Sequence, residues 1–390
     1  FCTAQETFAT ITGWDQQLFP SYMLVNATIR NSDADDPQDT DNAADDTEQV
    51  TVLGDPHGLL GVQVEAPADN TPITVTVECS EILERSMFRG TLATGGAAYN
   101  VFPHIRYRYR SLVRNKQATP LAITYTVKVG DNEPESFADN ATLRSVNDCP
   151  FAIKMPDGEV IDTSYMFAAY VNEQHPFVDK LLREALDDGV VESFTGYQSD
   201  DPDDLYRQVY ALWHALTKRD VRYSSITASE ATSSMVYCQH VRLIDESINN
   251  SQANCVDGAV LLASMMREIN IEPVLIVLPH HCYVAFYLDR DHTQLIGLET
   301  TLIGDKIASA PSPLPGAQNV VNDKWRAENS WRSFCAAVES GTQDLAENRA
   351  KFEEDPDYRQ VSIEDARESG ILPIAFDTNS HFKARTGIQD

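Results

Sequence analysis

Three residues whose side chains serve in nucleophilic catalysis follow one another in the middle of the chain: Cys255, His281 and Glu299. A thiol, an imidazole and a carboxylate can act as a nucleophile, its general base and a group that orients the base. Together they can attack a carbonyl carbon and pass the proton to a leaving group. Such chemistry requires that the elements carrying the three side chains meet at one place.

The element that carries Cys255 is predicted to be a buried helix. Residues 256–266 are almost all apolar or small, which predicts a helix over 255–270 that begins at or just after the cysteine. A thiol at a helix N-terminus faces the positive end of the helix dipole, which lowers its pKa and favours the thiolate. The free N–H groups of the first turn, that of Cys255 included, can also stabilise an oxyanion.

The other two residues are predicted to lie on neighbouring strands. After Pro273, strands are expected at 274–278, 279–288 and 295–301, with His281 near the start of the second and Glu299 in the third. Alternation along a strand places His281 on the same face as Tyr283 and Ala285. A hairpin register can then bring Glu299 beside His281. The rival base is His280, one residue earlier, but His281 fits the strand better.

These segments resemble the transglutaminase-like superfamily of papain-type cysteine enzymes. In that family a Cys opens a long apolar helix, a His begins a strand that continues through an aromatic residue and Val, and an acidic residue precedes a Thr. The matching runs are Asn254-Cys255-Val256-Asp257, His281-Cys282-Tyr283-Val284 and Leu298-Glu299-Thr300-Thr301. The resemblance covers about residues 200–302. This sequence departs from the usual pattern because Glu299 stands where Asp is common.

The resemblance implies an α+β papain-type domain in which Cys255 forms a thioester with a peptide or carboxamide carbonyl. Water as the acceptor makes a peptidase or amidase, and a lysine amine makes a cross-linking transferase. Hydrolysis is favoured because it needs only water. The alternative is a non-catalytic structural or adhesive envelope protein that uses the same fold as a scaffold, since the superfamily includes members whose triad is not used in catalysis.

Two glutamines upstream of the nucleophile, Gln239 and Gln252, are candidate oxyanion donors, or else plain polar surface residues. A zinc site is a weaker alternative. It would use His280, His281 and Cys282, but neighbouring strand residues diverge and their spacing with Cys238 and His240 matches no common zinc motif. Cys282 is expected to be a core residue on the opposite face of the strand from His281.

The N-terminal part has a period of two, which predicts an antiparallel β-sandwich of immunoglobulin-like type over residues 1–152. Strands are expected at 21–29, 73–77, 105–110 and 122–129, with Arg106, Arg108 and Arg110 on one strand face. A transglutaminase-like domain follows at 153–310, with helices at 172–187 and from Asp201 to 218. A Pro-rich connector and a helical C-terminal extension occupy 311–390.

The chain carries 59 acidic and 30 basic side chains, a net charge of −29 over 390 residues. Nucleic acid and anionic membranes are therefore excluded as main partners, because both require a basic surface. No apolar run approaches the roughly 18–20 residues that span a bilayer. Eight acids gather in 33–48, which predicts a solvated loop or a weak calcium site; no other cofactor is expected. The calcium candidates are Asp33, Asp35, Asp36, Asp39 and Asp41.

The seven cysteines are too few for a disulfide scaffold, and their odd number leaves at least one outside intramolecular pairing. Cys79 with Cys149 is the expected bridge. The chain begins at Phe1, which suggests that a signal peptide has been removed. We therefore expect an extracytoplasmic protein, secreted, periplasmic or on the cell surface. Its partner would be a polypeptide substrate or an extracellular or envelope protein; the sequence does not specify an oligomeric state.

Overall fold

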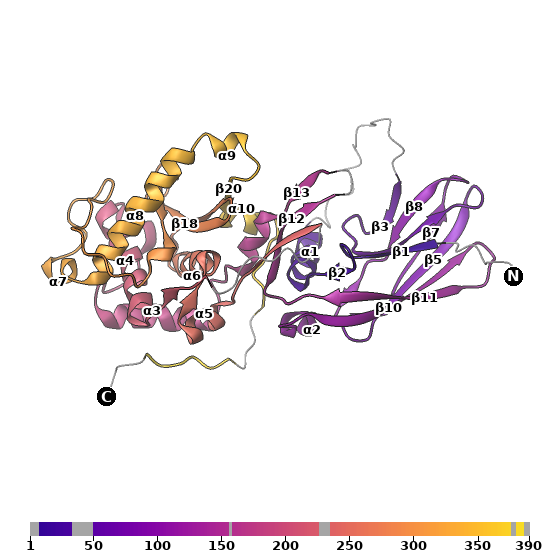
Figure 1. Ribbon diagram of the computed structural model, residues 1–390, viewed down its shortest axis with the longest axis horizontal. Coiled ribbons are helices and arrows are strands. Elements are labelled where there is room, and N and C mark those ends of the chain that lie inside the picture. The colour runs from indigo at the N-terminus through magenta and orange to yellow at the C-terminus, as the bar shows by residue number, and fades with distance from the viewer. Residues whose placement is uncertain (1–7, 33–49, 156–157, 226–234, 376–379, 386–390) are drawn as a thin grey trace. The chain divides into compact units, whose positions relative to one another are not determined.

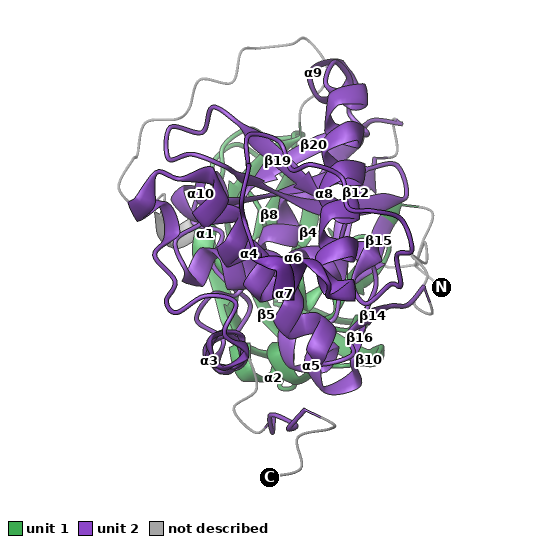
Figure 2. Ribbon diagram, turned by 90° about the vertical axis from the view of Figure 1, so that its left-hand side faces the viewer, with its two compact units in different colours: residues 1–148, 233–236 green, residues 149–232, 237–390 purple. Residues whose placement is uncertain are grey.

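The computed structural model describes residues 8–32, 50–155, 158–225, 235–375 and 380–385. The fold is α+β, with several sheets and helices (Figure 1). The chain divides into two compact units, residues 1–148 with 233–236 and residues 149–232 with 237–390 (Figure 2). The first unit thus ends four residues before the predicted boundary, and residues 311–390 belong to the second. The acidic run and its calcium candidates lie outside the described residues.

The first unit contains two larger sheets, with strand orders β1-β4-β8-β3 and β2-β11-β10-β5-β7. Alternate residues of both sheets supply one hydrophobic core, among them Val62, Val75, Ile123 and Tyr125. The elements are β1 (Phe8–Thr12), β2 (Gln17–Leu18), α1 (Pro20–Ser32), β3 (Thr51–Gly54), β4 (Leu60–Glu65), β5 (Thr71–Glu78), β6 (Leu83–Glu84), β7 (Ser86–Leu92), β8 (Ala98–Phe102), β9 (Arg106–Tyr107), α2 (Tyr109–Arg114), β10 (Thr119–Val129) and β11 (Glu135–Leu143).

The predicted alternation is confirmed in β5 and β10, whose inward residues are buried and whose pairing is antiparallel. Two pairings differ from the expected antiparallel pattern, because β3 runs parallel to β8 and β2 parallel to β11. The predicted strand at 21–29 is wrong. This segment is helix α1, which Pro20 opens at a position where its missing N–H costs nothing.

Two further predictions in this region are wrong. The arginine stripe does not lie on one strand, because β9 ends at Tyr107 and helix α2 contains Arg110. Cys79 and Cys149 do not form a disulfide. The Cys79 thiol donates instead to the Glu81 carboxylate, 3.3 Å away, and the Cys149 thiol to the carbonyl of Pro150, 4.0 Å away.

The second unit is built around the sheet β19-β18-β17-β20, in which every neighbouring pair is antiparallel. β12 and β15 each begin with one residue of the first unit. The elements are β12 (Asp148–Lys154), β13 (Val160–Asp162), η2 (Ser164–Tyr170), α3 (Pro176–Asp188), η3 (Gly196–Ser199), α4 (Pro202–Lys218), β14 (Arg222–Tyr223), β15 (Val236–His240), α5 (Ile244–Asn250), β16 (Gln252–Ala253), α6 (Cys255–Glu268), β17 (Pro273–Leu278), β18 (His281–Tyr287), β19 (Leu295–Leu298), η4 (Thr300–Leu302), α7 (Asp323–Arg326), α8 (Asn329–Asn348), α9 (Lys351–Glu354), β20 (Arg359–Ser362) and α10 (Ile363–Glu368).

The predicted helices of this unit are confirmed. Asp201 caps α4 by accepting from the N–H of Asp203, and Pro202 is its first residue. α4 then packs against α8, where the Trp213 indole donates to the Ser333 hydroxyl at 3.0 Å. None of the helices in the described part of the chain is both long and apolar enough to cross a bilayer.

The C-terminal residues complete the central sheet, which the sequence did not predict. β20 pairs with β17, with Leu275 opposite Val361. At the other end of the sheet, α8 contacts β19, and Leu345 of α8 packs with Phe352 on the sheet residues Tyr283 and Ala285. The segment 311–390 is therefore an integral part of this unit.

Candidate active site

Cys255 is the first residue of α6, as predicted. Asn254 caps the helix by accepting from the N–H of Asp257 at 2.8 Å, and the Asp257 carboxylate accepts from the N–H of Asn254 at 2.8 Å. This reciprocal capping box fixes where the helix starts and therefore where the thiol lies. Of the six cysteines that the structure describes, five are buried and Cys255 alone is partly exposed.

A buried ion pair holds this capping box in place. Asp257 is fully buried, and its carboxylate accepts from the backbone N–H of Arg242 at 2.7 Å and from the Arg242 guanidinium at 2.6 Å. Burial raises the pKa of the Asp257 carboxyl, while these hydrogen bonds and the charge of Arg242 oppose the increase. Removal of Arg242 would leave an acidic group buried beneath the thiol without its counter-charge.

His281 begins β18 directly after a tight turn. Leu278 pairs with His281, so Pro279 and His280 alone connect β17 to β18. His280 adopts a positive φ of 63° in this turn, and it is exposed. The Nε2 atom of His281 donates to Oε2 of Glu299 at 2.7 Å, and the His281 side chain is 32% exposed. The predicted pairing of the imidazole with the carboxylate is therefore confirmed.

Glu299 does not lie within a strand, which corrects the expected strand at 295–301. β19 ends at Leu298, and Glu299 is the N-cap of the short helix η4. Its Oε1 atom accepts from the N–H of Thr301 at 3.0 Å and from the Thr301 hydroxyl at 2.6 Å. The expected register holds, because Ala285 pairs with Gly297 and the residues that follow approach His281. Both oxygens of the carboxylate are thus engaged.

The site strongly favours a protonated His281. Its pKa is raised to about 10, first by a hydrogen bond with the Cys255 side chain and next by the hydrogen bond with Glu299, against an opposing effect of burial. Burial opposes ionisation of Glu299, but the hydrogen bonds from His281 and Thr301 outweigh it and lower the pKa of this carboxyl. At neutral pH the imidazolium therefore stands between Cys255 and an ionised Glu299.

Helix η4, which Glu299 caps, is in direct contact with helix α6, which begins at Cys255, and the sequence did not predict this contact. The Thr300 hydroxyl donates to the carbonyl of Cys255 at 3.3 Å. Gly258, one turn along α6, leaves room for this approach, because a Cβ atom there would lie 3.1 Å from the Thr300 side chain. The glycine within the apolar helix was the only sequence signal of this contact.

A second close approach joins Glu299 to α8. The N–H of Glu299 donates to the carbonyl of Ala337 at 2.9 Å. Gly297 and Gly341 meet beside it without side chains, since a Cβ atom on Gly341 would lie 2.6 Å from the N atom of Leu298. On the same helix, the Asp344 carboxylate accepts from the hydroxyl of Tyr283 at 2.8 Å. The ring of Tyr283 lies 5.9 Å from that of His281. α8 therefore contacts Glu299 directly and reaches His281 through Tyr283.

The glutamine candidates differ in their surroundings. Gln239 is buried, and its side-chain amide donates to the carbonyl of His240 at 3.0 Å. The side chain of Asn254 donates to the same carbonyl at 3.1 Å, which places the Gln239 amide next to the start of α6. Gln252 is the exposed residue of the two-residue strand β16. Tyr223 was missed by the sequence: it is 45% exposed, and burial first and then the charges of Cys255 and Glu299 raise the pKa of its phenol.

Cys282 is buried, as expected for a core residue on β18. Within the described residues, no three His, Cys, Asp or Glu side chains are grouped so that they could hold a metal ion. The zinc alternative with His280, His281 and Cys282 therefore has no support among them.

No protein-family model matches this sequence, and no curated protein matches it significantly. The resemblance of residues 200–302 to the transglutaminase-like superfamily therefore stays a prediction based on the motif residues themselves.

Proposed function

We propose that this protein is a cysteine-dependent acyl-transfer enzyme of the transglutaminase-like, papain-type class, acting on peptide or carboxamide bonds. The observation that carries the proposal is the position of His281 between Cys255 and Glu299, with its pKa raised to about 10 by both. An imidazolium beside a thiol favours the thiolate, which is the nucleophilic form of cysteine. Partial exposure of Cys255 gives a substrate access to it.

In the proposed reaction, the Cys255 sulfur forms a bond with the carbonyl carbon, and the carbonyl electron pair moves to oxygen. As the tetrahedral intermediate collapses, the C–N bond breaks and His281 gives its proton to the departing amine. A thioester and a neutral imidazole are left. His281 then takes a proton from water, the hydroxide oxygen attacks the thioester, and the carboxylic acid leaves as Cys255 returns to the thiolate.

Each neighbouring group has a definite part in this reaction. Glu299 accepts from Nε2, which directs the other ring nitrogen, Nδ1, to the thiol. The N–H groups of Cys255 and Val256, in the first turn of α6, have no partner within the helix and can receive the oxyanion. The buried Gln239 amide, beside the same helix end, is the better placed of the two glutamine candidates.

The proposal extends to the fold of the two units, the location of the protein and its substrate. A cysteine at the tip of a buried helix that contacts an antiparallel sheet supports a papain-type core. Two sheets around one core support an immunoglobulin-like sandwich in the first unit. We place the protein outside the cytoplasm, with a polypeptide as its substrate. Hydrolysis is preferred to cross-linking because water is the only second substrate that it needs.

The test is to incubate the protein with a mixed peptide library and measure new peptide termini and deamidated glutamine by mass spectrometry. The wild-type protein is expected to release products, and Cys255→Ala is expected to release none because no thioester can form. Equal turnover by Cys255→Ala would overturn the proposal. Absence of turnover by the wild type, together with slow alkylation of Cys255 that does not depend on His281, would favour the scaffold alternative.

A further inference from the structure

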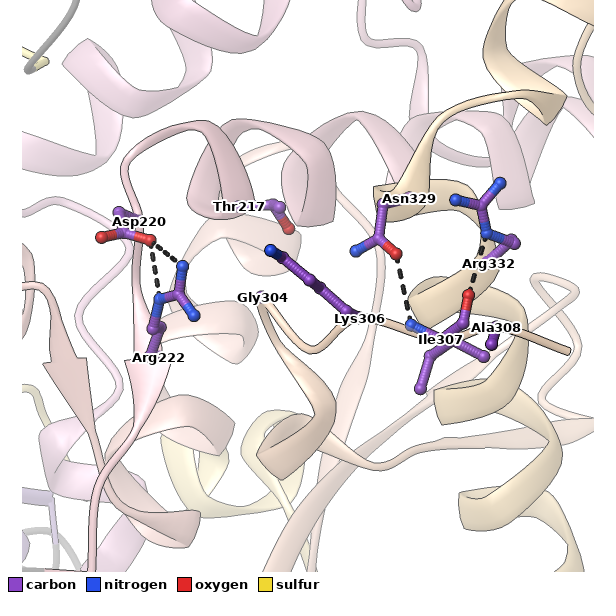
Figure 3. A pocket seen from close by; sticks show the side chains of 9 residues that line it. All are labelled: Thr217, Asp220, Arg222, Gly304, Lys306, Ile307, Ala308, Asn329 and Arg332. Atoms are coloured by element: carbon purple, nitrogen blue, oxygen red, sulfur yellow. Dashed lines mark hydrogen bonds and ion pairs between the residues drawn. The ribbon is translucent and has the colours of Figure 1, made fainter.

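A pocket of about 490 Å³ lies in the second unit, and Cys255, His281 and Glu299 are not among the residues that line it (Figure 3). Its walls are the end of α4, strand β14, the segment 304–308 that follows η4, and the first turn of α8. The volume falls within the range of sites that hold small ligands or single side chains.

The charge of this pocket is opposite to that of the chain. Arg222, Lys306 and Arg332 line it with one acid, Asp220, which leaves a formal excess of two positive charges (three minus one). The whole chain carries −29. Side chains with this excess in a concave site attract an anion, and guanidinium groups bind carboxylates and phosphates with defined geometry.

The three cations differ in what already holds them. Arg222 donates to the Asp220 carboxylate, at 2.7 Å from Nε and 2.6 Å from Nη2. Arg332 donates to two backbone carbonyls, those of Ile307 and Ala327, each at 3.0 Å. Lys306 makes no hydrogen bond or ion pair with any residue that the structure describes. Figure 3 shows its side chain extended between the Asp220–Arg222 pair and Asn329, with the ammonium end toward Thr217.

We propose that this pocket binds one carboxylate group, contributed by an acidic residue of the polypeptide substrate. Arg222 is paired with Asp220 and the Arg332 guanidinium is held by two backbone carbonyls, so Lys306 is the cation of the pocket that has no described partner and is left to bind a carboxylate. Asp220 stands at the same wall and repels any anion, a doubly charged group such as phosphate about twice as strongly as a carboxylate. The part of the proposal that concerns a polypeptide rests on the proposed function, whereas binding of a carboxylate does not.

The walls of the pocket continue into the segments that carry the catalytic residues. β14 pairs with β16, and the N–H of Ser224 donates to the carbonyl of Ala253, two residues before Cys255. On the other wall, Gly304 follows η4, the helix that Glu299 caps. Gly304 has a φ of 77°, and a Cβ atom there would lie 2.9 Å from the carbonyl oxygen of Val221, so the two walls are in contact.

The experiment measures binding rather than turnover, in the Cys255→Ala variant. Two fluorescent pentapeptides are compared, acetyl-Ala-Ala-Glu-Ala-Ala-amide and the same peptide with Gln in place of Glu, which has the same shape without the charge. Each is titrated against Lys306→Met and Lys218→Met in this background. Lys306 is exposed and free of described partners, so its replacement should leave the fold intact. Lys218 is an exposed lysine next to Thr217 that does not line the pocket.

The Glu peptide is expected to bind more tightly than the Gln peptide, and Lys306→Met should weaken it about fivefold while Lys218→Met leaves it unchanged. Equal binding of the two peptides, or equal weakening by both lysine variants, overturns the proposal. A single acetyl-glutamate amide that binds as tightly as the pentapeptide overturns the polypeptide part, and the ligand is then a free acid. The experiment measures binding and not turnover, so its outcomes can be interpreted even if the protein proves to have no catalytic activity.

Discussion

Two cysteines in this protein, Cys79 and Cys255, stand near a glutamate in different surroundings. Cys79, in the first unit, donates its thiol directly to Glu81, and burial first and then this contact raise the pKa of the thiol to about 11. In the second unit a protonated His281 stands between Cys255 and Glu299. A carboxylate next to a thiol keeps it protonated, whereas the same group behind an imidazole holds a positive charge against the sulfur.

The comparison predicts that the reactivity of a thiol depends on its burial and on the order of the neighbouring charges, as well as on the residue types present. Fewer than about one in a thousand Cys79 thiols is ionised at pH 7.5, given its pKa of about 11. Burial also raises the pKa of Cys335, to about 12, so it is an internal reference for an inert thiol. The following changes test whether His281 and its support account for the difference.

The largest expected difference is between the two thiols of the native protein. Iodoacetamide at pH 7.5 should alkylate Cys255 at least about a hundredfold faster than Cys79, because Cys255 is partly exposed and faces an imidazolium. His281→Asn should remove most of this advantage and leave Cys79 unchanged. Mass spectrometry of tryptic peptides gives both rates from one sample. Similar rates for the two thiols in the native protein would contradict the comparison.

A smaller effect is expected from Glu299→Gln. The variant lacks the carboxylate that accepts a hydrogen bond from His281, which is the second cause of the raised His281 pKa. The pKa of His281 should therefore fall below 10, and alkylation of Cys255 should slow about tenfold. The pKa of His281 in the folded protein, about 10, is higher than its ordinary value of 6.5. Protonated His281 therefore stabilises the fold fully below pH 6.5, and this stabilisation is lost as the pH rises toward 10. Urea unfolding between these values should show less pH dependence in the variant.

NMR of labelled histidine reports the His281 pKa in the same Glu299→Gln sample. Glu81→Gln is the matched control, because it removes the carboxylate beside Cys79 and should instead lower the pKa of that thiol. An unchanged His281 pKa in Glu299→Gln would show that the carboxylate does not stabilise the imidazolium.

The smallest effect on the thiol is expected from Gly341→Ala, which perturbs Glu299 from the side of α8. The added methyl group would lie 2.6 Å from the N atom of Leu298, so α8 must move and the Glu299–Ala337 hydrogen bond must change. We expect a loss of about 2 kcal/mol in unfolding free energy and about threefold slower alkylation of Cys255. Ser340→Ala, on the exposed side of α8, is the control and should change neither. Unaltered stability in Gly341→Ala would refute the close contact.

Local signals in the sequence predicted the parts of the site that depend on neighbouring residues. The start of α4 at Pro202 follows from the Asp-Pro cap, and the start of α6 at Cys255 follows from Asn254 and the apolar run behind it. The hairpin that brings Glu299 to His281 follows from alternation and a short turn. The position of the Cys255 thiol at a helix tip is thus encoded by its immediate neighbours in the chain.

The remaining features depend on contacts between segments far apart in the chain. The segment predicted as a strand at 21–29 is helix α1, which starts at Pro20 and packs Met23, with Tyr22 and Leu24, on the core of the first unit. Support of Glu299 by Ala337 and the meeting of Gly297 with Gly341 leave only scattered glycines as sequence signals. The pairing of β20 with β17 has no local signal, because register across nearly a hundred residues is set by tertiary packing.

The closing of the central sheet by α8 and β20 has a consequence for how the protein is made. Cys255, His281 and Glu299 are synthesised before residues 329–362, which cover β19 and pair with β17. At about 5–20 residues per second, the nascent chain carries these three residues for seconds before their sheet can be completed. The arrangement of Cys255, His281 and Glu299 can therefore be completed only when synthesis of this unit is almost finished.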